Sequence, residues 1–284
     1  MGNVALQIEN LWWKYEGVET WTLQGIDYEL DVGKCLGIVG ATGAGKTTLL
    51  RCLNGLIPHS FNGLMKGNVR VLGNDTREKK VFDIAMSVGT VFEDAEAQFV
   101  ATTLEEDVAF GLENLALPRE EMRRRIDWSL GIVGLSGFER RNAHELSGGQ
   151  KQRAALASIL AMRPRVLLLD EPSAELDPLG KSEVFEIIKS LKEDQKMTIV
   201  LVEQDTEEMM PIVDELILLQ SGKIALRGEA TSFFARTREL QEAGVRPLDA
   251  AIILSDLGVQ ASEFSVESVS ANIANKMKRD RGDK

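Results

Sequence analysis

The chain is organised around the segment Gly40-Ala41-Thr42-Gly43-Ala44-Gly45-Lys46-Thr47-Thr48, which fits the phosphate-loop pattern G-x-x-x-x-G-K-[ST]. The apolar run Cys35–Val39 before it predicts a buried strand, and residues 48–54 after it predict a helix. A strand, a glycine-rich turn and a helix in this order are the context that the pattern requires. We therefore expect an α/β fold that binds a nucleoside triphosphate at this segment.

Each residue type in this segment has a physical role beside a phosphate. Gly40, Gly43 and Gly45 let the backbone turn tightly and bring several N–H groups onto an anion without a clashing Cβ atom. The helix N-terminus adds partial positive charge beneath the phosphates. We expect Lys46 to reach the β- and γ-phosphates and the Thr47 hydroxyl to bind Mg²⁺.

Length and composition limit the remaining choices. The 284 residues can form one large α/β domain with an appendage. A net charge of −11 argues against nucleic-acid binding, which uses a basic surface. Cys35 and Cys52 lack metal-ligand spacing and are expected to be reduced packing residues. The longest apolar runs are too short to span a bilayer, so we expect a cytosolic chain that reaches a membrane only through a partner.

The order of apolar runs predicts an antiparallel start followed by a parallel core. Residues 4–34 carry several aromatic side chains and are expected to form short antiparallel strands, with a further strand over 67–74. Two buried strands, 165–170 and 197–202, flank the helix 181–193 and predict a parallel strand–helix–strand unit. The other expected elements are a strand over 88–92, mostly helical structure from about 103 to 162, a hairpin over 216–226, and helices over 231–242, 247–257 and 266–278.

Two carboxylates follow directly after one of the buried strands. In open α/β sheets, ligands lie at the carboxyl ends of the strands. We expect Asp170 to hold Mg²⁺ through water and Glu171 to polarise the attacking water. The alternative is that these acids merely end a strand, and the phosphate loop in the same chain weighs against it.

A second anion-binding helix N-terminus is predicted at Ser147-Gly148-Gly149-Gln150, with Ser147 as the N-cap. One chain cannot easily bring two such termini to one phosphate from opposite sides. A head-to-tail pair can do so, with the Ser147 loop of each subunit closing over the Lys46 loop of the other. We therefore expect a dimer with two composite sites.

The phosphate loop, Leu146–Gln150, Leu169–Pro172 and Ala174–Asp177 together resemble the Walker, signature and D-loop motifs of ATP-binding cassette (ABC) ATPases. The resemblance covers about residues 4–228 in the correct order. It implies a P-loop NTPase cassette with a RecA-like parallel-sheet core, an N-terminal antiparallel β subdomain and a helical signature subdomain at about 95–162. It also implies ATP as the nucleotide, Tyr15 as the residue that stacks on adenine, and Asp177 as an acid at the subunit contact. A plain core role for Tyr15 is the alternative, with Trp12 and Trp13 as the other candidates for stacking.

The chain departs from the family pattern at two positions. Glu93 stands where a glutamine usually reaches Mg²⁺ and the membrane partner, although Gln98 is a second candidate for that glutamine. Gln204 stands at the switch position, which is usually histidine; glutamine can donate a hydrogen bond to a γ-phosphate but cannot carry a charge. We expect Lys46, Glu93, Glu171 and Gln204 to form the catalytic set, with hydrolysis slowed by the two departures.

A narrower resemblance is to the ATPases of energy-coupling-factor transporters. It rests on Val91–Phe99, Glu105–Gly111 and Gly244–Gly258. It implies a peripheral subunit on the cytoplasmic face of the membrane, working with a second cassette, a membrane scaffold and a substrate-binding membrane protein to import a vitamin or transition-metal ion. Residues 229–284 are expected to form a small helical C-terminal extension that strengthens the pairing of ATPase subunits without touching nucleotide, because its amphipathic helices need apolar cover. The alternative is that these helices pack only on their own cassette.

Other functions remain as alternatives. The chain is an ATPase of another ABC importer, a partly degenerate ATP-binding partner in a heterodimer, or a soluble cassette ATPase acting on DNA or the ribosome. Residues 49–146 contain neither the long coiled coil nor the Cys-x-x-Cys hook of DNA-repair relatives. The acidic composition also disfavours nucleic acid.

Overall fold

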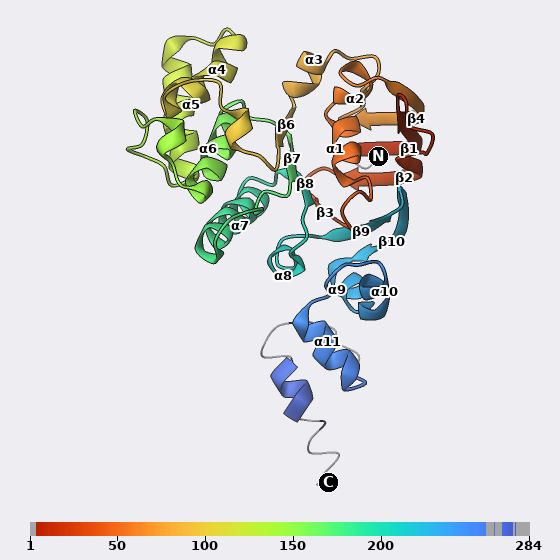
Figure 1. The fold of residues 1–284 in the computed structure, drawn as a ribbon. Helices are drawn as coiled ribbons and strands as arrows, with labels where there is room; N and C mark the ends of the chain where they lie inside the picture. The colour runs from red at the N-terminus through yellow and green to blue at the C-terminus, as the bar shows by residue number, and fades with distance from the viewer. Residues whose placement is uncertain (1–3, 260–263, 265–268, 275, 277–284) are drawn as a thin grey trace.

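The computed structural model describes residues 4–259, 264, 269–274 and 276. Figure 1 shows two β-sheets in the upper part of the molecule, a helical lobe beside them and a helical extension that projects downward to the C-terminus. One sheet has four strands in the order β2-β1-β4-β5, and the other has six in the order β10-β9-β3-β8-β7-β6. The fold is α/β, as the sequence predicts.

The four-stranded sheet is antiparallel and contains β1 (Val4–Tyr15), β2 (Leu23–Asp31), β4 (Gly63–Val71) and β5 (Asn74–Asp75). The first two strands confirm the predicted antiparallel start, but they are not short, since β1 has 12 residues. The third strand begins at Gly63 rather than at Gly67. Gly67 lies opposite a β-bulge of β1 at Asn10 and Leu11: it has φ +80°, and a Cβ atom there would lie 2.1 Å from the carbonyl oxygen of Asn10.

The six-stranded sheet contains β3 (Cys35–Val39), β6 (Val88–Val91), β7 (Val166–Asp170), β8 (Thr198–Val202), β9 (Glu215–Gln220) and β10 (Lys223–Glu229). All neighbours pair in parallel except β9 and β10, which form the predicted hairpin. Every residue of β3, β7 and β8 is buried, which fits continuous apolar runs in a sheet covered on both faces. The predicted parallel core is confirmed.

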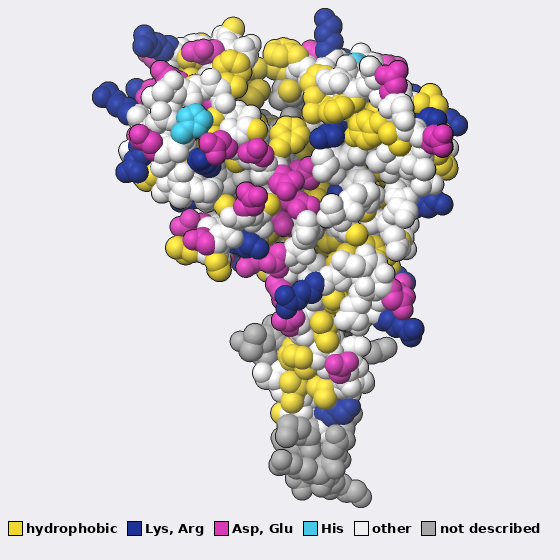
Figure 2. Space-filling model, viewed as in Figure 1, with side chains coloured by type: hydrophobic (Ala, Val, Ile, Leu, Met, Phe, Trp, Pro, Cys, Tyr) yellow, Lys and Arg dark blue, Asp and Glu magenta, His cyan; other side chains and the backbone are white. Residues whose placement is uncertain are grey.

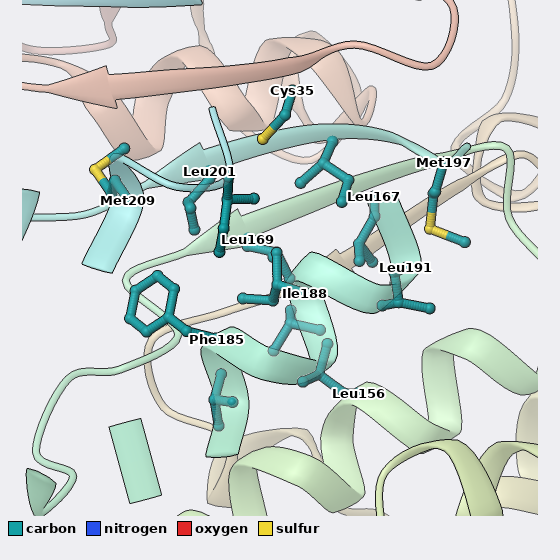
Figure 3. Close-up of a cluster of buried hydrophobic side chains, with 14 of the residues drawn as sticks. Cys35, Leu156, Leu167, Leu169, Phe185, Ile188, Leu191, Met197, Leu201 and Met209 are labelled. Carbon is teal, nitrogen blue, oxygen red and sulfur yellow. The ribbon is translucent and has the colours of Figure 1, made fainter. Parts of the chain in front are cut away.

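Helices cover both faces of this sheet. The face toward the antiparallel sheet packs on α1 (Lys46–Leu53), with α2 (Leu56–His59) and α3 (Val81–Ala85) nearby. On the other face, Phe185, Ile188 and Leu191 of α7 (Pro178–Glu193) point toward Leu167, Leu169 and Leu201 of the sheet (Figure 3). The helical lobe consists of α4 (Leu104–Asn114), α5 (Arg119–Ile132) and α6 (Gly148–Ala161), with 3₁₀ segments η1 (Glu96–Gln98) and η2 (Ala143–Glu145). The short helix α8 (Thr206–Met209) follows β8.

The C-terminal extension begins with α9 (Ala230–Phe234), α10 (Thr237–Glu242) and α11 (Asp249–Asp256). The prediction of one helix over 231–242 is wrong, because Arg236 has non-helical φ and ψ and separates α9 from α10. The bend lets Phe233, Phe234 and Leu240 all enter the core of their own chain. Residues 269–274 and 276 are helical, within the predicted last helix, whereas the rest of that helix and the basic end of the chain lie outside the described residues.

The turn of the β9–β10 hairpin joins the two sheets to the phosphate loop. Gly222 N donates to Ala44 O at 3.1 Å, and Gln24 N, in β2, donates to Gly222 O at 2.8 Å. The side chain of Gln24 also donates to Ser221 O at 2.9 Å. A Cβ atom at Gly222 would lie 2.3 Å from Thr22 O, so glycine is required for this close approach. The hairpin therefore fixes the phosphate loop against the antiparallel sheet.

Candidate nucleotide site

The phosphate loop connects β3 to α1 through three glycines with positive φ: Gly40 at 153°, Gly43 at 79° and Gly45 at 108°. A Cβ atom at Gly40 would lie 2.3 Å from the carbonyl oxygen of Leu219, so the loop lies directly against β9. Gly45 is the N-cap of α1, and no side chain caps this helix. The first N–H groups of α1 therefore point into the loop, as an anion site at a helix N-terminus requires.

Lys46 is buried and lies at the centre of the site. Its side chain is 6% exposed, and Nζ donates to Gly40 O at 2.9 Å and to Ala41 O at 3.4 Å. The same Nζ lies 3.4 Å from Oε1 of Glu171. The structure thus brings together the predicted cation and the predicted water-activating carboxylate, although they are far apart in sequence.

Asp170 ends β7 and is 4% exposed. Burial is the main cause of its raised pKa; a hydrogen bond with the Thr47 side chain opposes the rise, and Glu171 and Glu93 add to it. A buried carboxylate beside a hydroxyl and further carboxylates suits a hard divalent cation with oxygen ligands. Within the described residues, no group of three or more histidine, cysteine or acidic side chains could hold a metal ion by itself. The residues present therefore fit Mg²⁺ only where phosphate and water oxygens complete its coordination.

Glu171 has a left-handed backbone, with φ +50°, which is strained for a residue other than glycine. Its backbone N–H donates to Val202 O at 2.9 Å, which ties it to the end of β8. Nε2 of Gln204 donates to Oε2 of Glu171 at 2.7 Å. The two Glu171 oxygens are therefore held by different partners, one by Lys46 and the other by Gln204.

Glu93 and Gln98, the two candidates for the glutamine position after β6, have different surroundings. Oε1 of Gln98 accepts from Phe92 N at 2.9 Å, and its Nε2 donates to Thr90 O at 3.3 Å, so this side chain folds back onto the strand end. Glu93 acts electrostatically on Asp170 and lines the cavity beside Glu171. The strand itself ends at Val91, one residue before its predicted end.

Ser147 is the N-cap of α6, as predicted, in a capping box with Gln150. Its hydroxyl accepts from Gln150 N at 3.3 Å, and its own N–H donates to Oε1 of Gln150 at 3.0 Å. Gly149 lets α6 approach α7, because a Cβ atom there would lie 3.3 Å from Cα of Gly180. Ser147 is exposed, and α6 packs on α4, α5 and α7 rather than on α1.

The aromatic candidates differ in burial. Trp13 is fully buried, so the prediction that it could stack on adenine is wrong. Tyr15 is half-buried, and its hydroxyl lies 3.1 Å from Oγ1 of Thr48, at the start of α1. Nη1 of Arg51 donates to the same hydroxyl at 3.3 Å, and the Tyr15 ring packs edge-on against Phe61. Tyr15 therefore lies next to the phosphate loop and also belongs to the packed interior.

A cavity of about 470 Å³ opens beside Glu171, and most of its charged lining is acidic. Figure 2 shows acidic side chains gathered between the helical lobe and the rest of the molecule. The lining includes Glu203, which is 3% exposed and which the sequence reasoning missed. Burial raises the pKa of Glu203, although its carboxylate accepts from Ser173 N at 2.9 Å and from Gln204 N at 3.2 Å. An acid directly after a buried strand, as at Asp170, was the available signal.

The fold and this site define a class: a phosphate-loop cassette with carboxylates at the carboxyl ends of a parallel sheet and a second exposed helix N-terminus on a separate lobe. Residues 23–174 match the ABC transporter family, and the chain belongs to that family. It is an ABC-type ATPase cassette. No helix in the described part of the chain is both long and apolar enough to cross a bilayer.

Curated relatives carry the name ABC transporter ATP-binding protein. One, from Pyrococcus abyssi, is 41% identical over 241 residues, which are 85% of this chain and 86% of the relative. One from Methanosarcina mazei is 38% identical over 266 residues, which are 94% of this chain and 46% of the relative. The chain therefore spans about half the length of some of its relatives and most of the length of others.

Two solved structures are similar to the chain. One is cbiO1 from Clostridium perfringens, described as part of the ABC transporter complex cbiONQ, with a TM-score of 0.75 and 30% identity over 84% of this chain and 94% of that one. The other is a dimeric ATP-binding cassette in a post-hydrolysis state bound to ADP and Pi, with a TM-score of 0.70 and 25% identity over 79% of this chain and 98% of that one.

Proposed function

We propose that this chain is the ATP-binding and hydrolysing subunit of an energy-coupling-factor-type importer of a vitamin or transition-metal ion. The observation that carries the proposal is the structural likeness to cbiO1, which extends over 84% of the chain. The segments Val91–Phe99 and Gly244–Gly258, which resemble that subfamily, support it. The chain is then a peripheral subunit on the cytoplasmic face of the membrane.

The catalytic roles follow from the contacts of each side chain. The N–H groups at the start of α1 and Nζ of Lys46 bind the β- and γ-phosphates, which replace the Gly40 and Ala41 carbonyls as partners of Lys46. Thr47 and Asp170, with Glu93 nearby, would hold Mg²⁺, which neutralises phosphate charge when bound. Glu171 orients the attacking water and accepts its proton. Gln204 holds Glu171 and donates a hydrogen bond to the γ-phosphate.

The site is completed by a second cassette. Ser147 is exposed at the start of α6, which packs on α4, α5 and α7 rather than on α1, so residues 147–150 bind the γ-phosphate held by the partner. Two copies arranged head to tail make two such sites. The dimeric cassette with ADP and Pi supports this arrangement.

Residues 1–228 then form the ATPase domain and residues 229–284 the extension. Phe233, Phe234 and Leu254 are buried on their own cassette, so these residues are not free to cover a partner. Within the described part of the extension, the side of α11 that carries Ile253, which is 44% exposed, is available for pairing subunits. Ile253→Asp should weaken subunit association without nucleotide, and unchanged association by sedimentation would remove the pairing role.

A second candidate function rests on Glu93 and Gln204. A negative charge beside Asp170 and an uncharged switch residue favour a slow site. The chain would then pair with a more typical cassette and use its Ser147 loop to complete the partner's fast site. Steady-state phosphate release by the purified chain alone, compared with the same chain plus its partners, distinguishes the two functions.

A tagged chain captured from detergent-solubilised membranes tests the importer proposal. The expected result is recovery of two kinds of integral membrane protein, a scaffold and a small substrate-binding subunit, with or without a second cassette. A capture without the tagged chain is the control. Recovery of ribosomal or DNA-repair proteins in place of membrane subunits would overturn the proposal.

A further inference from the structure

The segment of residues 244–249, which consists of the loop after α10 and the first residue of α11, lies beside the phosphate loop and the cavity at Glu171. We call it the extension loop. A Cβ atom at Gly244 would lie 3.9 Å from Cβ of Ala41 in the phosphate loop. Arg246 lines the same cavity as Glu171 and Gln204. The C-terminal extension therefore reaches the hydrolysis end of the cassette, although the sequence predicts that it stays away from nucleotide.

Two hydrogen bonds fasten the extension loop to α8, directly after Gln204. Oγ1 of Thr206 donates to Arg246 O at 2.9 Å, and Thr206 is 2% exposed. The backbone N–H of Asp249 donates to Oε1 of Glu207 at 2.7 Å. Asp249 is the first residue of α11, whose N-cap residue Leu248 makes no side-chain cap, so Glu207 stabilises this helix N-terminus from another element.

Apolar packing keeps the extension loop in this position. Val245 and Leu248 are 7% and 2% exposed and belong to the same core cluster as Met209 of α8. The loop is thus held both by its core side chains and by its hydrogen bonds. A shift of the loop would have to disturb this packing, so α8 has a fixed support beneath it.

Only Asp205 separates Gln204 from Thr206. Its side chain caps α8 by accepting from Glu207 N at 3.3 Å, and it lies 3.4 Å from Nζ of Lys181. The chain from Gln204 into α8 is therefore short, and side-chain contacts of Asp205 hold it at both α8 and Lys181. A displacement of Thr206 or Glu207 would move the Gln204 side chain away from Oε2 of Glu171.

We propose that Thr206 and Glu207, held by the backbone of Arg246 and Asp249, are positioning residues that make the C-terminal extension part of the hydrolysis site by aligning Gln204 with Glu171. The inference rests on the role of Gln204 under the proposed function. The extension then supports turnover within its own chain, in addition to any role between subunits. The extension therefore affects the rate of the chemical step more than the affinity for ATP.

Paired substitutions in the full chain separate the hydrogen bonds from general damage. Thr206→Val and Glu207→Ala remove them, whereas Thr206→Ser and Glu207→Gln keep the hydroxyl donor and the oxygen acceptor. We expect kcat for ATP to fall about three- to tenfold in the first pair, with KM changed by less than about twofold, and near-parental values in the second. Arg238→Ala, which changes an exposed side chain of α10, is the matched control and should not change kcat. Equal losses in Thr206→Val and Thr206→Ser would overturn the proposal.

A double substitution tests whether the effect passes through Gln204. In a Gln204→Ala background, Thr206→Val should cause little further loss of kcat, because the residue that it positions is absent. If Thr206→Val lowers kcat by the same factor in the Gln204→Ala background as in the parent, the two residues act independently and the inference is overturned. If Gln204→Ala alone leaves turnover unchanged, the assigned role of Gln204 under the proposed function fails instead.

Amide hydrogen exchange provides a readout that does not depend on turnover. Residues 204–209 should exchange faster in Thr206→Val and Glu207→Ala than in the parent, while exchange in the core strand β7 stays the same. Unchanged exchange over 204–209 would show that the extension loop does not hold this segment, whatever the hydrolysis rate.

Discussion

Gln204 and Glu171 are joined by a hydrogen bond of 2.7 Å between Nε2 and Oε2, which connects the ends of two neighbouring parallel strands. Gln204 follows β8, and Glu171 follows β7 with a left-handed backbone. With Nζ of Lys46 3.4 Å from the other Glu171 oxygen, the carboxylate has little freedom to rotate. A water molecule that it orients would therefore have a defined direction of attack.

Lys46→Ala and Glu171→Gln should have different effects. Lys46→Ala removes a buried cation that makes charge-assisted hydrogen bonds, and we expect ATP affinity to fall about a hundredfold. Glu171→Gln should keep ATP binding, slow hydrolysis about 10²- to 10⁴-fold and accumulate an ATP-bound dimer. Nucleotide retention and gel filtration with ATP measure both effects. Hydrolysis at the parental rate in Glu171→Gln would refute the assignment of the water-activating carboxylate.

The composite site can be tested without damaging α6, because Ser147 caps this helix. Ser147→Asp retains an N-cap acceptor but adds a negative charge where the partner's γ-phosphate should lie. We expect ATP-dependent dimerisation to weaken about tenfold or more. Ser147→Asn, which caps the helix without the charge, is the matched control, and Ser147→Arg adds bulk and a misplaced cation. Unchanged dimerisation by sedimentation in Ser147→Asp would argue against the composite site.

The two departures from the family pattern predict a gain of activity. Gln204→His allows a charged donor to the γ-phosphate, which is worth about 1.5–3 kcal/mol against about 1 kcal/mol for a neutral one, so the rate should rise by up to about tenfold. Glu93→Gln removes a negative charge beside Asp170 and should lower the Mg²⁺ dependence of ATP binding. Steady-state phosphate release is measured with and without membrane partners. A fast parent that Gln204→His does not improve would mean that glutamine is a working switch residue.

The buried aromatic pair in α9 predicts that the extension stabilises the cassette itself. Phe234→Ala removes a side chain that is 0% exposed and should cost about 3–5 kcal/mol of unfolding free energy. Denaturant unfolding measures this cost, provided that the dependence of the unfolding free energy on denaturant concentration has the same slope in both proteins. Truncation after Gly228 removes the same packing, so it is not a clean test of subunit pairing. A cost below about 1 kcal/mol would mean that this packing is not stabilising.

Both thiols should be inert in the folded chain. Burial raises the pKa of Cys35 to about 12 and raises that of Cys52 as well. Neither should react with iodoacetamide at pH 8, and both should react after denaturation. The unfolded thiols lose protons from about pH 8.5, below the folded values, so the unfolding free energy should fall as the pH rises above 8.5. This fall in unfolding free energy should be smaller in Cys52→Ala. Labelling of the native protein at pH 8 would contradict the expectation that both thiols are inert.

The sequence predicted the fold class and the family because both depend on local patterns. Fully apolar runs identify β7 and β8, and the phosphate-loop spacing identifies the turn between β3 and α1. The meeting of Lys46, Glu171 and Gln204 could be expected from strand order, since the residues after parallel strands meet at one edge of a sheet. The functional roles of these residues stay predictions.

What the sequence could not predict depends on packing between distant segments. The strand predicted over 67–74 begins earlier, at Gly63, because residues before Gly67 also pair with β1, across a bulge at Asn10 and Leu11 that no local pattern indicates. The break at Arg236 has no glycine or proline signal and follows from burial of Phe233 and Phe234. The bonds of Thr206 and Glu207 to the extension loop join residues about 40 positions apart, and no spacing rule indicates them.

The backbone of the turn Ser221–Gly222 forms hydrogen bonds with both the phosphate loop and β2. This connection affects how a ligand could bind. Strand β1, which pairs with β2 and ends at Tyr15, keeps a fixed separation from the loop. The separation of Tyr15 from the phosphate loop is therefore set by the fold of this chain before any ligand binds. The entropy cost of aligning Tyr15 with the phosphate loop is then part of folding and is not incurred again at each turnover.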